Sequence, residues 1–146
     1  MDVVILGIDP GIANCGVCVI DPNDKGQTIK SLDTLTTDKN VSPAARRHEL
    51  LESITQMVDA LGITQMAWEA YYHHRGTMHI PKLIGLLEHY CYIRGMPYTE
   101  VNPAEVKAYK HVHKRAITQI RCNPNVTQHE IDACCVAEIV LSETSD

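Results

Sequence analysis

The chain has 146 residues with a formal net charge of −5, and 45% of its residues are hydrophobic. That length suits one domain with its own core and leaves no room for a second of similar size, so we expect a single domain over residues 1–146. No apolar run approaches the length of a membrane span, and no membrane association is predicted. The chain enters a strand pattern directly, without a signal or transit peptide, which favours a cytoplasmic location.

The six cysteines are consistent with that location. Most of them lie inside apolar periodic segments, where we expect reduced and buried thiols rather than disulfides. These are Cys15, Cys18, Cys91, Cys134 and Cys135. A zinc site is an alternative, and its candidate ligands are His89, Cys91, His111, His113 and Cys122. No pair among them has Cys-x-x-Cys spacing, so the pattern favours free thiols.

The first strand pattern, Val3–Ile8, is an almost unbroken apolar run of the kind that is buried on both faces of a sheet. It ends at Asp9-Pro10-Gly11, where proline withdraws a backbone donor and glycine permits positive φ, so the chain must turn. Asp9 is therefore held at the mouth of a central strand. Such an aspartate either caps the turn or takes part in chemistry, and the rest of the chain bears on that choice.

Two further strand patterns precede the first helix. They are Gly16–Asp21 and Thr28–Thr37, and with the first strand they predict an antiparallel meander. Ser42 and Pro43 then form a favourable N-cap and first residue for a helix, whose apolar residues recur at helical spacing up to Gly62.

Shorter strands and more helices follow in the second half. Gln65–Ala70 is a short strand pattern, and Thr77–Arg94 is a helical pattern that Gly95 stops. Tyr98–Val101 is a fifth strand pattern, after which Asn102-Pro103 opens a basic helical segment. The order of these elements predicts a mixed α/β domain rather than a doubly wound one.

The last predicted helix begins at Thr127 and continues to about Leu141. Its first residues, Thr127-Gln128-His129-Glu130, have the form of a capping box, with threonine at the N-cap and glutamate at N3.

The negative net charge hides a local concentration of positive charge. Between Pro103 and Arg121 there are five basic residues and one acidic residue, without counting two histidines. A basic segment in a chain whose acids gather elsewhere is consistent with a phosphodiester substrate. From charge alone, a solvated helix face is an equal alternative.

Candidate metal ligands occur in three separate places. Asp9 follows the first strand, and Glu69 lies near the end of the fourth. If these strands are parallel neighbours, the two carboxylates emerge at the same edge of the sheet. His129 and Asp132 are three residues apart and share a face of the last helix. Oxygen ligands with one imidazole suit Mg²⁺ or Mn²⁺, and two such ions about 4 Å apart support phosphodiester hydrolysis.

Structural roles are conceivable for each of these residues taken alone. Glu69 and Asp132, however, lie in apolar surroundings, where a lone charge is costly. His129, in a first helical turn, is by itself more typical of a surface residue. Three carboxylates in such settings favour metal chemistry.

Four segments resemble, in order and spacing, the RuvC-type Holliday-junction resolvases of the ribonuclease-H-like superfamily. They are GIDPG with Gly16 downstream, AWEAYY, VNPAEVKAY and HEIDACCVA, and the resemblance runs from Leu6 to about Ala137. It implies a ribonuclease-H-like mixed five-stranded sheet flanked by helices. It also implies an endodeoxyribonuclease that resolves four-way DNA junctions with two Mg²⁺ or Mn²⁺ ions, at the nucleoid or, for a viral protein, in the host cytoplasm.

The resemblance implies roles for individual residues. The places of the family's metal-binding residues, the third of which is His or Asp, are taken by Asp9, Glu69, His129 and Asp132. Lys114 takes the place of a catalytic lysine. The residues expected to contact DNA, as phosphate contacts or as an aromatic at the junction centre, are Tyr72, Lys107, Lys110, Lys114, Arg115 and Arg121.

The sequence also departs from the family pattern. The turn reads Ile12-Ala13-Asn14-Cys15 where bacterial members have a Ser-Arg and a Thr-Gly pattern, and the chain is shorter and acidic. These departures are typical of a viral or otherwise divergent member, and they bear on cleavage preference and junction selectivity.

Three alternatives stay open. One is a broader nuclease that acts on branched DNA, flaps or RNA with the same residues. Another is a non-catalytic nucleic-acid-binding module, against which the intact acids speak, because a binder gains nothing from negative charge near phosphates. The third is an actin-like sugar kinase, whose phosphate loop shares the Asp-x-Gly turn but which needs two such domains.

The helix predicted at Thr77–Arg94 has two apolar stripes. The stripe wide enough to cover the sheet consists of Ile80, Leu83, Ile84, Leu87, Tyr90 and Cys91. The stripe on the opposite side, next to Gly85, consists of Met78, Leu86, Tyr92 and Ile93. We expect this second stripe to form a two-fold dimer, as in the RuvC-type enzymes, unless the basic segment or the C-terminal tail folds over it.

Overall fold

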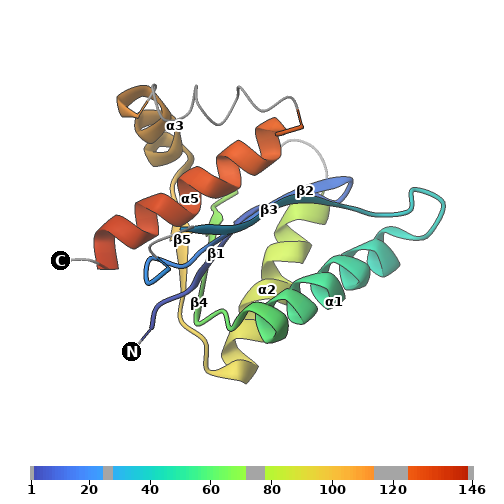
Figure 1. The fold of residues 1–146 in the computed structure, drawn as a ribbon. Helices are drawn as coiled ribbons and strands as arrows, with labels where there is room; N and C mark the ends of the chain where they lie inside the picture. The colour runs from blue at the N-terminus through green and yellow to red at the C-terminus, as the bar shows by residue number, and fades with distance from the viewer. Residues whose placement is uncertain (1, 25–27, 72–77, 114–124, 145–146) are drawn as a thin grey trace.

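A computed structural model describes residues 2–24, 28–71, 78–113 and 125–144, and its fold is shown in Figure 1. Five strands form one sheet in the order β3-β2-β1-β4-β5. Their bounds are Ile5–Asp9 for β1, Asn14–Ile20 for β2, Ile29–Thr36 for β3, Gln65–Glu69 for β4 and Tyr98–Val101 for β5. β1 pairs antiparallel with β2, and β2 with β3, so the predicted meander is confirmed. β1 pairs parallel with β4, which is the condition under which Asp9 and Glu69 emerge at the same edge.

Helices cover both faces of this sheet (Figure 1). Their bounds are Pro43–Leu61 for α1, His79–Arg94 for α2, Pro103–Val112 for α3 and Gln128–Thr144 for α5. α1 and α2 pack on one face, and α5 lies across the other with α3 beside it. The expected mixed five-stranded sheet flanked by helices is confirmed.

The two-residue period of the strands divides the core between the faces. In β1, Leu6 and Ile8 belong to the cluster under α1 and α2, and Ile5 belongs to the cluster under α5. Asp9 is four residues after Ile5 and therefore lies on the α5 face. The central strand is buried on both faces, as its apolar run predicts.

Several boundaries differ from the sequence prediction. β2 begins at Asn14 rather than Gly16, because Asn14 and Cys15 already pair with β3, and the turn after Asp9 is correspondingly tighter. α5 continues to Thr144, past the predicted end near Leu141. α2 begins at His79, whereas Thr77, its predicted first residue, is outside the described residues.

Side chains cap the starts of α1 and α3, and the sequence predicts the cap at Ser42. The Ser42 side chain accepts a hydrogen bond from the Ala45 backbone N–H (3.2 Å), and the Asn102 side chain accepts one from Ala104 (2.8 Å). Gly62 adopts φ 64° where α1 ends, which only glycine does without strain. The expectation of reduced, buried thiols is confirmed for Cys15, Cys18, Cys91, Cys134 and Cys135. In the ranges described, no helix is long and apolar enough to cross a membrane.

α2 has the two apolar stripes that its sequence predicts. Leu83, Ile84, Leu87 and Cys91 are buried against the sheet. In the opposite stripe, Leu86 is partly buried, whereas the other members are open to solvent, with exposed fractions of 62% for Met78, 66% for Ile93 and 85% for Tyr92.

Candidate active site

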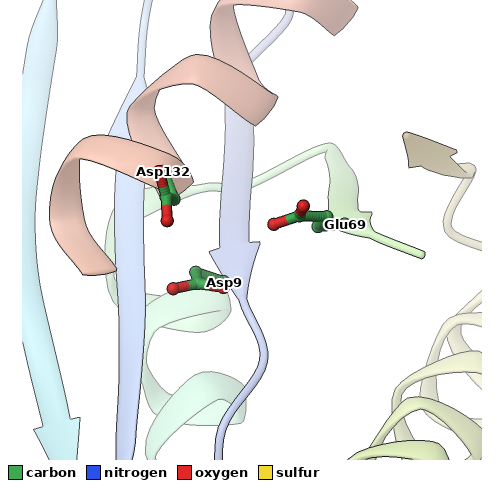
Figure 2. Close-up of side chains that lie close together, drawn as sticks. All are labelled: Asp9, Glu69 and Asp132. Atoms are coloured by element: carbon green, nitrogen blue, oxygen red, sulfur yellow. The ribbon is translucent and has the colours of Figure 1, made fainter. Parts of the chain in front are cut away.

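Three carboxylates from three elements converge on one point (Figure 2). Asp9 is the last residue of β1, Glu69 is the last residue of β4, and Asp132 is in the first two turns of α5. One oxygen from each lies within 4.8 Å of those from the others, and each side chain is partly buried. Residues 9, 69 and 132, which the sequence predicts as ligands, are therefore brought together.

The sheet register explains why two of these acids meet. β1 and β4 run parallel with Ile8 opposite Trp68, so Asp9 and Glu69, one step further on, leave adjacent strands at the same edge. Two residues before each acid, and on the same α5 face of the sheet, lie the small residues Gly7 and Ala67, which are paired across the two strands. The alternation therefore aims both carboxylates toward α5.

Glycines bring the third acid into reach. A Cβ added at Gly16 of β2 would lie 2.1 Å from the carbonyl oxygen of His129, and one at Gly7 would lie 2.3 Å from that of Ala133. Because these positions have no side chain, α5 lies directly on β1 and β2. This close approach places Asp132 over the ends of the strands.

Burial and neighbouring negative charge raise the pKa of two of these carboxylates, Asp9 and Glu69. Burial raises the pKa of Asp9 above its ordinary value and the negative charge of Asp132 adds to this, while the hydrogen bond with His129 acts in the opposite direction. Burial also raises the pKa of Glu69, with further contributions from Asp9 and Asp132. A divalent cation would relieve this repulsion, and the all-oxygen donor set suits Mg²⁺ or Mn²⁺. The residues present therefore fit such an ion.

His129 lies beside the acids and contacts one of them. Its Nδ1 is hydrogen-bonded to Oδ2 of Asp9 at 3.0 Å, and 45% of its side chain is exposed. It is not part of the group of described residues whose ligand atoms lie within 4.8 Å of one another. Its role as a fourth ligand stays a prediction.

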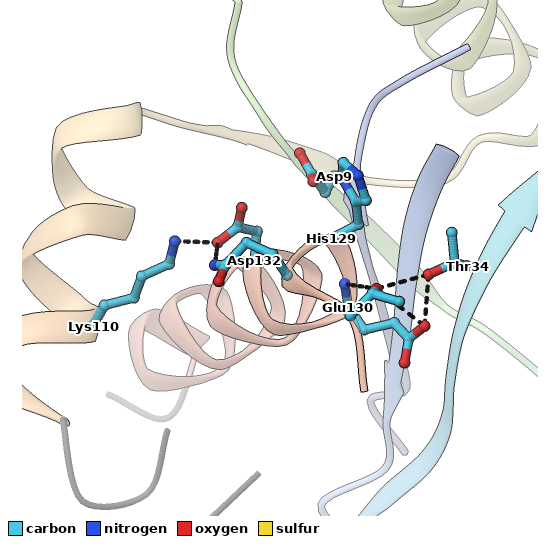
Figure 3. Close-up of polar contacts among 8 residues, drawn as sticks. Asp9, Thr34, Lys110, His129, Glu130 and Asp132 are labelled. Carbon is cyan, nitrogen blue, oxygen red and sulfur yellow. Dashed lines mark hydrogen bonds and ion pairs between the residues drawn. The ribbon is translucent and has the colours of Figure 1, made fainter. Parts of the chain in front are cut away.

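Glu130 is a residue that the sequence analysis did not place at the site. It is 6% exposed, and one carboxylate oxygen accepts hydrogen bonds from the hydroxyls of Thr34 (2.5 Å) and Thr127 (3.2 Å), as Figure 3 shows in part. The Thr127 hydroxyl also accepts a hydrogen bond from the Glu130 backbone N–H, so Thr127 caps the start of α5 as predicted. The glutamate ties the start of α5 to β3 and holds the helix that carries Asp132.

Lys110 of α3 reaches the acid cluster directly. Its ammonium forms an ion pair with Asp132 (Figure 3), and its positive charge partly offsets the raised pKa of Asp9 and of Glu69. Lys107, one turn earlier, is exposed. The other predicted DNA contacts, Tyr72, Lys114, Arg115 and Arg121, are outside the described residues.

Two hollows adjoin the acids. One of about 480 Å³ is lined by Asp9 and Glu69 together with Tyr71, an aromatic that the sequence analysis did not single out. The other, of about 290 Å³, runs from Asp9 to His129 along the turn between β1 and β2. The carboxylates are therefore accessible from outside, as a substrate would require.

Among the described residues, the candidate zinc ligands do not come together into a metal site. Among the described histidines, cysteines and acids, the group with metal-ligand proximity is the acidic one. Cys91 is buried and its thiol contacts the sulfur of Met66 (3.6 Å). Cys122 is outside the described residues.

Comparisons with known proteins agree with this geometry. A curated relative from Leifsonia xyli, a crossover junction endodeoxyribonuclease RuvC, is 29% identical over 74% of this chain, and the chain spans only 54% of its length. One of the same name from Prochlorococcus marinus subsp. pastoris is 22% identical, with 95% of this chain and 96% of the relative covered.

Solved structures show the same fold at low identity. A structure of T. thermophilus RuvC in complex with a Holliday junction substrate superposes with a TM-score of 0.74 at 17% identity, covering 92% of this chain and 90% of that one. The fowlpox virus Holliday junction resolvase gives 0.62 at 15% identity, covering 98% and 99%.

The sequence profile of one family matches nearly the whole chain. It is that of the crossover junction endodeoxyribonuclease RuvC, and it matches residues 5–137, from the first residue of β1 into α5. The matched range includes all three acids of the cluster and the helix that carries Lys110. The chain therefore belongs to the crossover junction endodeoxyribonuclease RuvC family.

Proposed function

We propose that this protein is a divalent-metal-dependent endonuclease that resolves four-way DNA junctions. The observation that carries the proposal is the convergence of Asp9, Glu69 and Asp132 at the ends of two parallel strands, in a chain of the RuvC family. Relatives with this fold have been solved with Holliday junction DNA, which supports a branched DNA substrate. The same proposal includes a cytoplasmic location.

The three carboxylates would hold Mg²⁺ or Mn²⁺, and we propose that the site binds two such ions. Bound there, the metal would supply an activated water and stabilise the leaving oxygen of a phosphodiester. Asp9 and Glu69 would bind the ion from the ends of β1 and β4, and Asp132 would bind it from α5. His129 holds Asp9 in place through its hydrogen bond or adds a ligand of its own.

DNA contacts in this proposal come from α3 and the segment after it. Lys107 is exposed and suited to a phosphate, and Lys114 would stabilise charge on the phosphorus centre during cleavage. Arg115 and Arg121, in the same basic segment of the sequence, would contact further phosphates. Tyr72, three residues after Glu69, would stack on an unpaired base at the junction centre.

We also propose that the protein acts as a two-fold dimer through α2. Support comes from its open apolar stripe, where Met78, Tyr92 and Ile93 are exposed. A hollow of about 790 Å³ beside α2 and β5 adjoins this stripe at Tyr92 and includes Gly85. Two sites related by a two-fold axis would cut the two opposed strands of a junction symmetrically.

A cleavage panel tests the proposed substrate. Four-way, three-way, flap and linear duplex DNA of matched sequence are incubated with Mg²⁺ or Mn²⁺, and products are separated on denaturing gels. We expect paired incisions in the four-way junction and little cutting of the duplex. Equal rates on flaps or three-way junctions would instead indicate a broader branched-DNA nuclease.

A further inference from the structure

Lys110 engages a carboxylate that the proposed metal also needs. Its ammonium pairs with Oδ1 of Asp132 (Figure 3). The side-chain amide of Gln128 in α5 donates a hydrogen bond to the same oxygen at 3.0 Å. A carboxylate oxygen has two lone-pair directions, so these two donors engage the oxygen on the α3 side. An ion that uses Asp132 therefore meets a positive charge already bound to that ligand.

The pair is sheltered enough for this to matter. The side chain of Lys110 is 28% exposed and that of Asp132 is 19% exposed, whereas a fully hydrated surface pair contributes little. Shielding from water strengthens both the attraction between Lys110 and Asp132 and the repulsion between Lys110 and a second cation. The ammonium is thus a competitor of the metal at this carboxylate.

The position of Lys110 on α3 gives its ammonium a second partner. Lys107 lies three residues earlier and so on the same side of the helix, where it is exposed. A phosphate that approaches Lys107 comes within reach of the Lys110 ammonium, which is carried on a flexible four-carbon stem. A phosphate can therefore draw the ammonium away from Asp132.

We infer that Lys110 and a divalent cation compete for Asp132, and that a DNA phosphate ends the competition by taking the ammonium, so that metal and DNA strengthen each other's binding. The inference rests on the proposed function for its DNA half. Because coupling between two binding sites is reciprocal, the metal must also tighten DNA binding by the same factor. Lys110 is on this account a positioning and coupling residue rather than a simple phosphate contact.

The test measures by calorimetry the Kd of Ca²⁺ for the free protein and for its complex with a four-way junction. A denaturing gel verifies that the junction remains uncut. Lys110→Met keeps the aliphatic stem and removes the charge. We expect it to bind Ca²⁺ about fivefold tighter than wild type without DNA, and to lose the tightening by DNA that wild type shows. Circular dichroism verifies that the variant is folded.

Two variants serve as controls. Lys107→Met removes the same charge from the same helix without touching Asp132, so it should leave the Ca²⁺ Kd of the free protein unchanged. Lys110→Arg keeps a cation against Asp132 and should retain wild-type competition. Unchanged or weaker Ca²⁺ binding by Lys110→Met would overturn the inference, as would equal tightening by both methionine variants. The comparison of Ca²⁺ affinities without DNA tests the competition between Lys110 and the metal even if the protein does not bind junctions. A failure of the inference can therefore be told apart from a failure of the proposed function.

Discussion

Replacing Gly16 with alanine tests the close approach of α5 to the sheet. The new Cβ would lie 2.1 Å from the His129 carbonyl oxygen and 3.0 Å from the Glu130 nitrogen, whereas real Cβ contacts essentially never fall below 3.0 Å. Both neighbours are helix backbone and cannot rotate away. The start of α5 must therefore move outward by about 1 Å, since the interior is close-packed.

Two effects follow from that displacement. Overpacking of this kind lowers the free energy of unfolding by about 1–3 kcal/mol. Moving Asp132 about 1 Å from Asp9 and Glu69 would also spoil the site, and misplacement of that size costs about 10²-fold in rate. We therefore expect a folded but poorly active variant with weakened Mn²⁺ binding.

Urea unfolding, Mn²⁺ calorimetry and single-turnover cleavage of a four-way junction measure these effects. Glu52→Ala is the control for stability, because the side chain that it shortens is exposed on α1 and alanine is a strong helix former. Wild-type stability and Mn²⁺ affinity in Gly16→Ala would refute the argument that α5 rests directly on β2.

Three further predictions concern the rest of the molecule. Burial raises the pKa of Glu138, so the charged form of this side chain opposes folding at pH values above the ordinary pKa of a glutamate. Glu138→Gln should therefore raise the free energy of unfolding at pH 7, and this gain should vanish below about pH 4, where the glutamate is protonated in both states. Urea titrations at the two pH values measure the difference. Glu130→Ala should cost about 1–3 kcal/mol in the same assay because two threonine hydroxyls lose their acceptor, whereas Glu143→Ala, at an exposed position of α5, should cost almost nothing; equal values would contradict this role. Leu86→Glu with Ile93→Glu should give a folded monomer in sedimentation, and a surviving dimer would place the interface elsewhere.

Local patterns in the sequence were sufficient to predict much of the site. The apolar run before Asp9 predicts a central strand, and the short strand before Glu69 predicts its neighbour. Once the two strands are parallel, the two-residue period alone puts both carboxylates on one face. The caps at Ser42 and Asn102 likewise depend on neighbouring residues only, and both are present.

Features that depend on long-range packing could not be predicted in this way. The pattern at Thr127–Glu130 correctly indicates a helix start, but the burial of Glu130 arises from Thr34, 96 residues away on an edge strand. Lys110 looks like any solvated lysine of a basic helix until α3 packs beside α5. The small residues that let α5 approach the sheet, such as Gly7, are informative only when the partner helix is known.

The central claim is that Asp9, Glu69 and Asp132 form the metal site of a junction-cutting nuclease. It is tested most directly by measuring cleavage and gel-shift affinity for a four-way junction with one preparation each of wild type, Glu69→Gln and the exposed control Glu49→Gln, in Mg²⁺. The account predicts that Glu69→Gln gives no product while its affinity for the junction is unchanged or higher, because a negative charge near the phosphates is removed, and that Glu49→Gln cuts as wild type does. Cleavage by Glu69→Gln at the wild-type rate would contradict it.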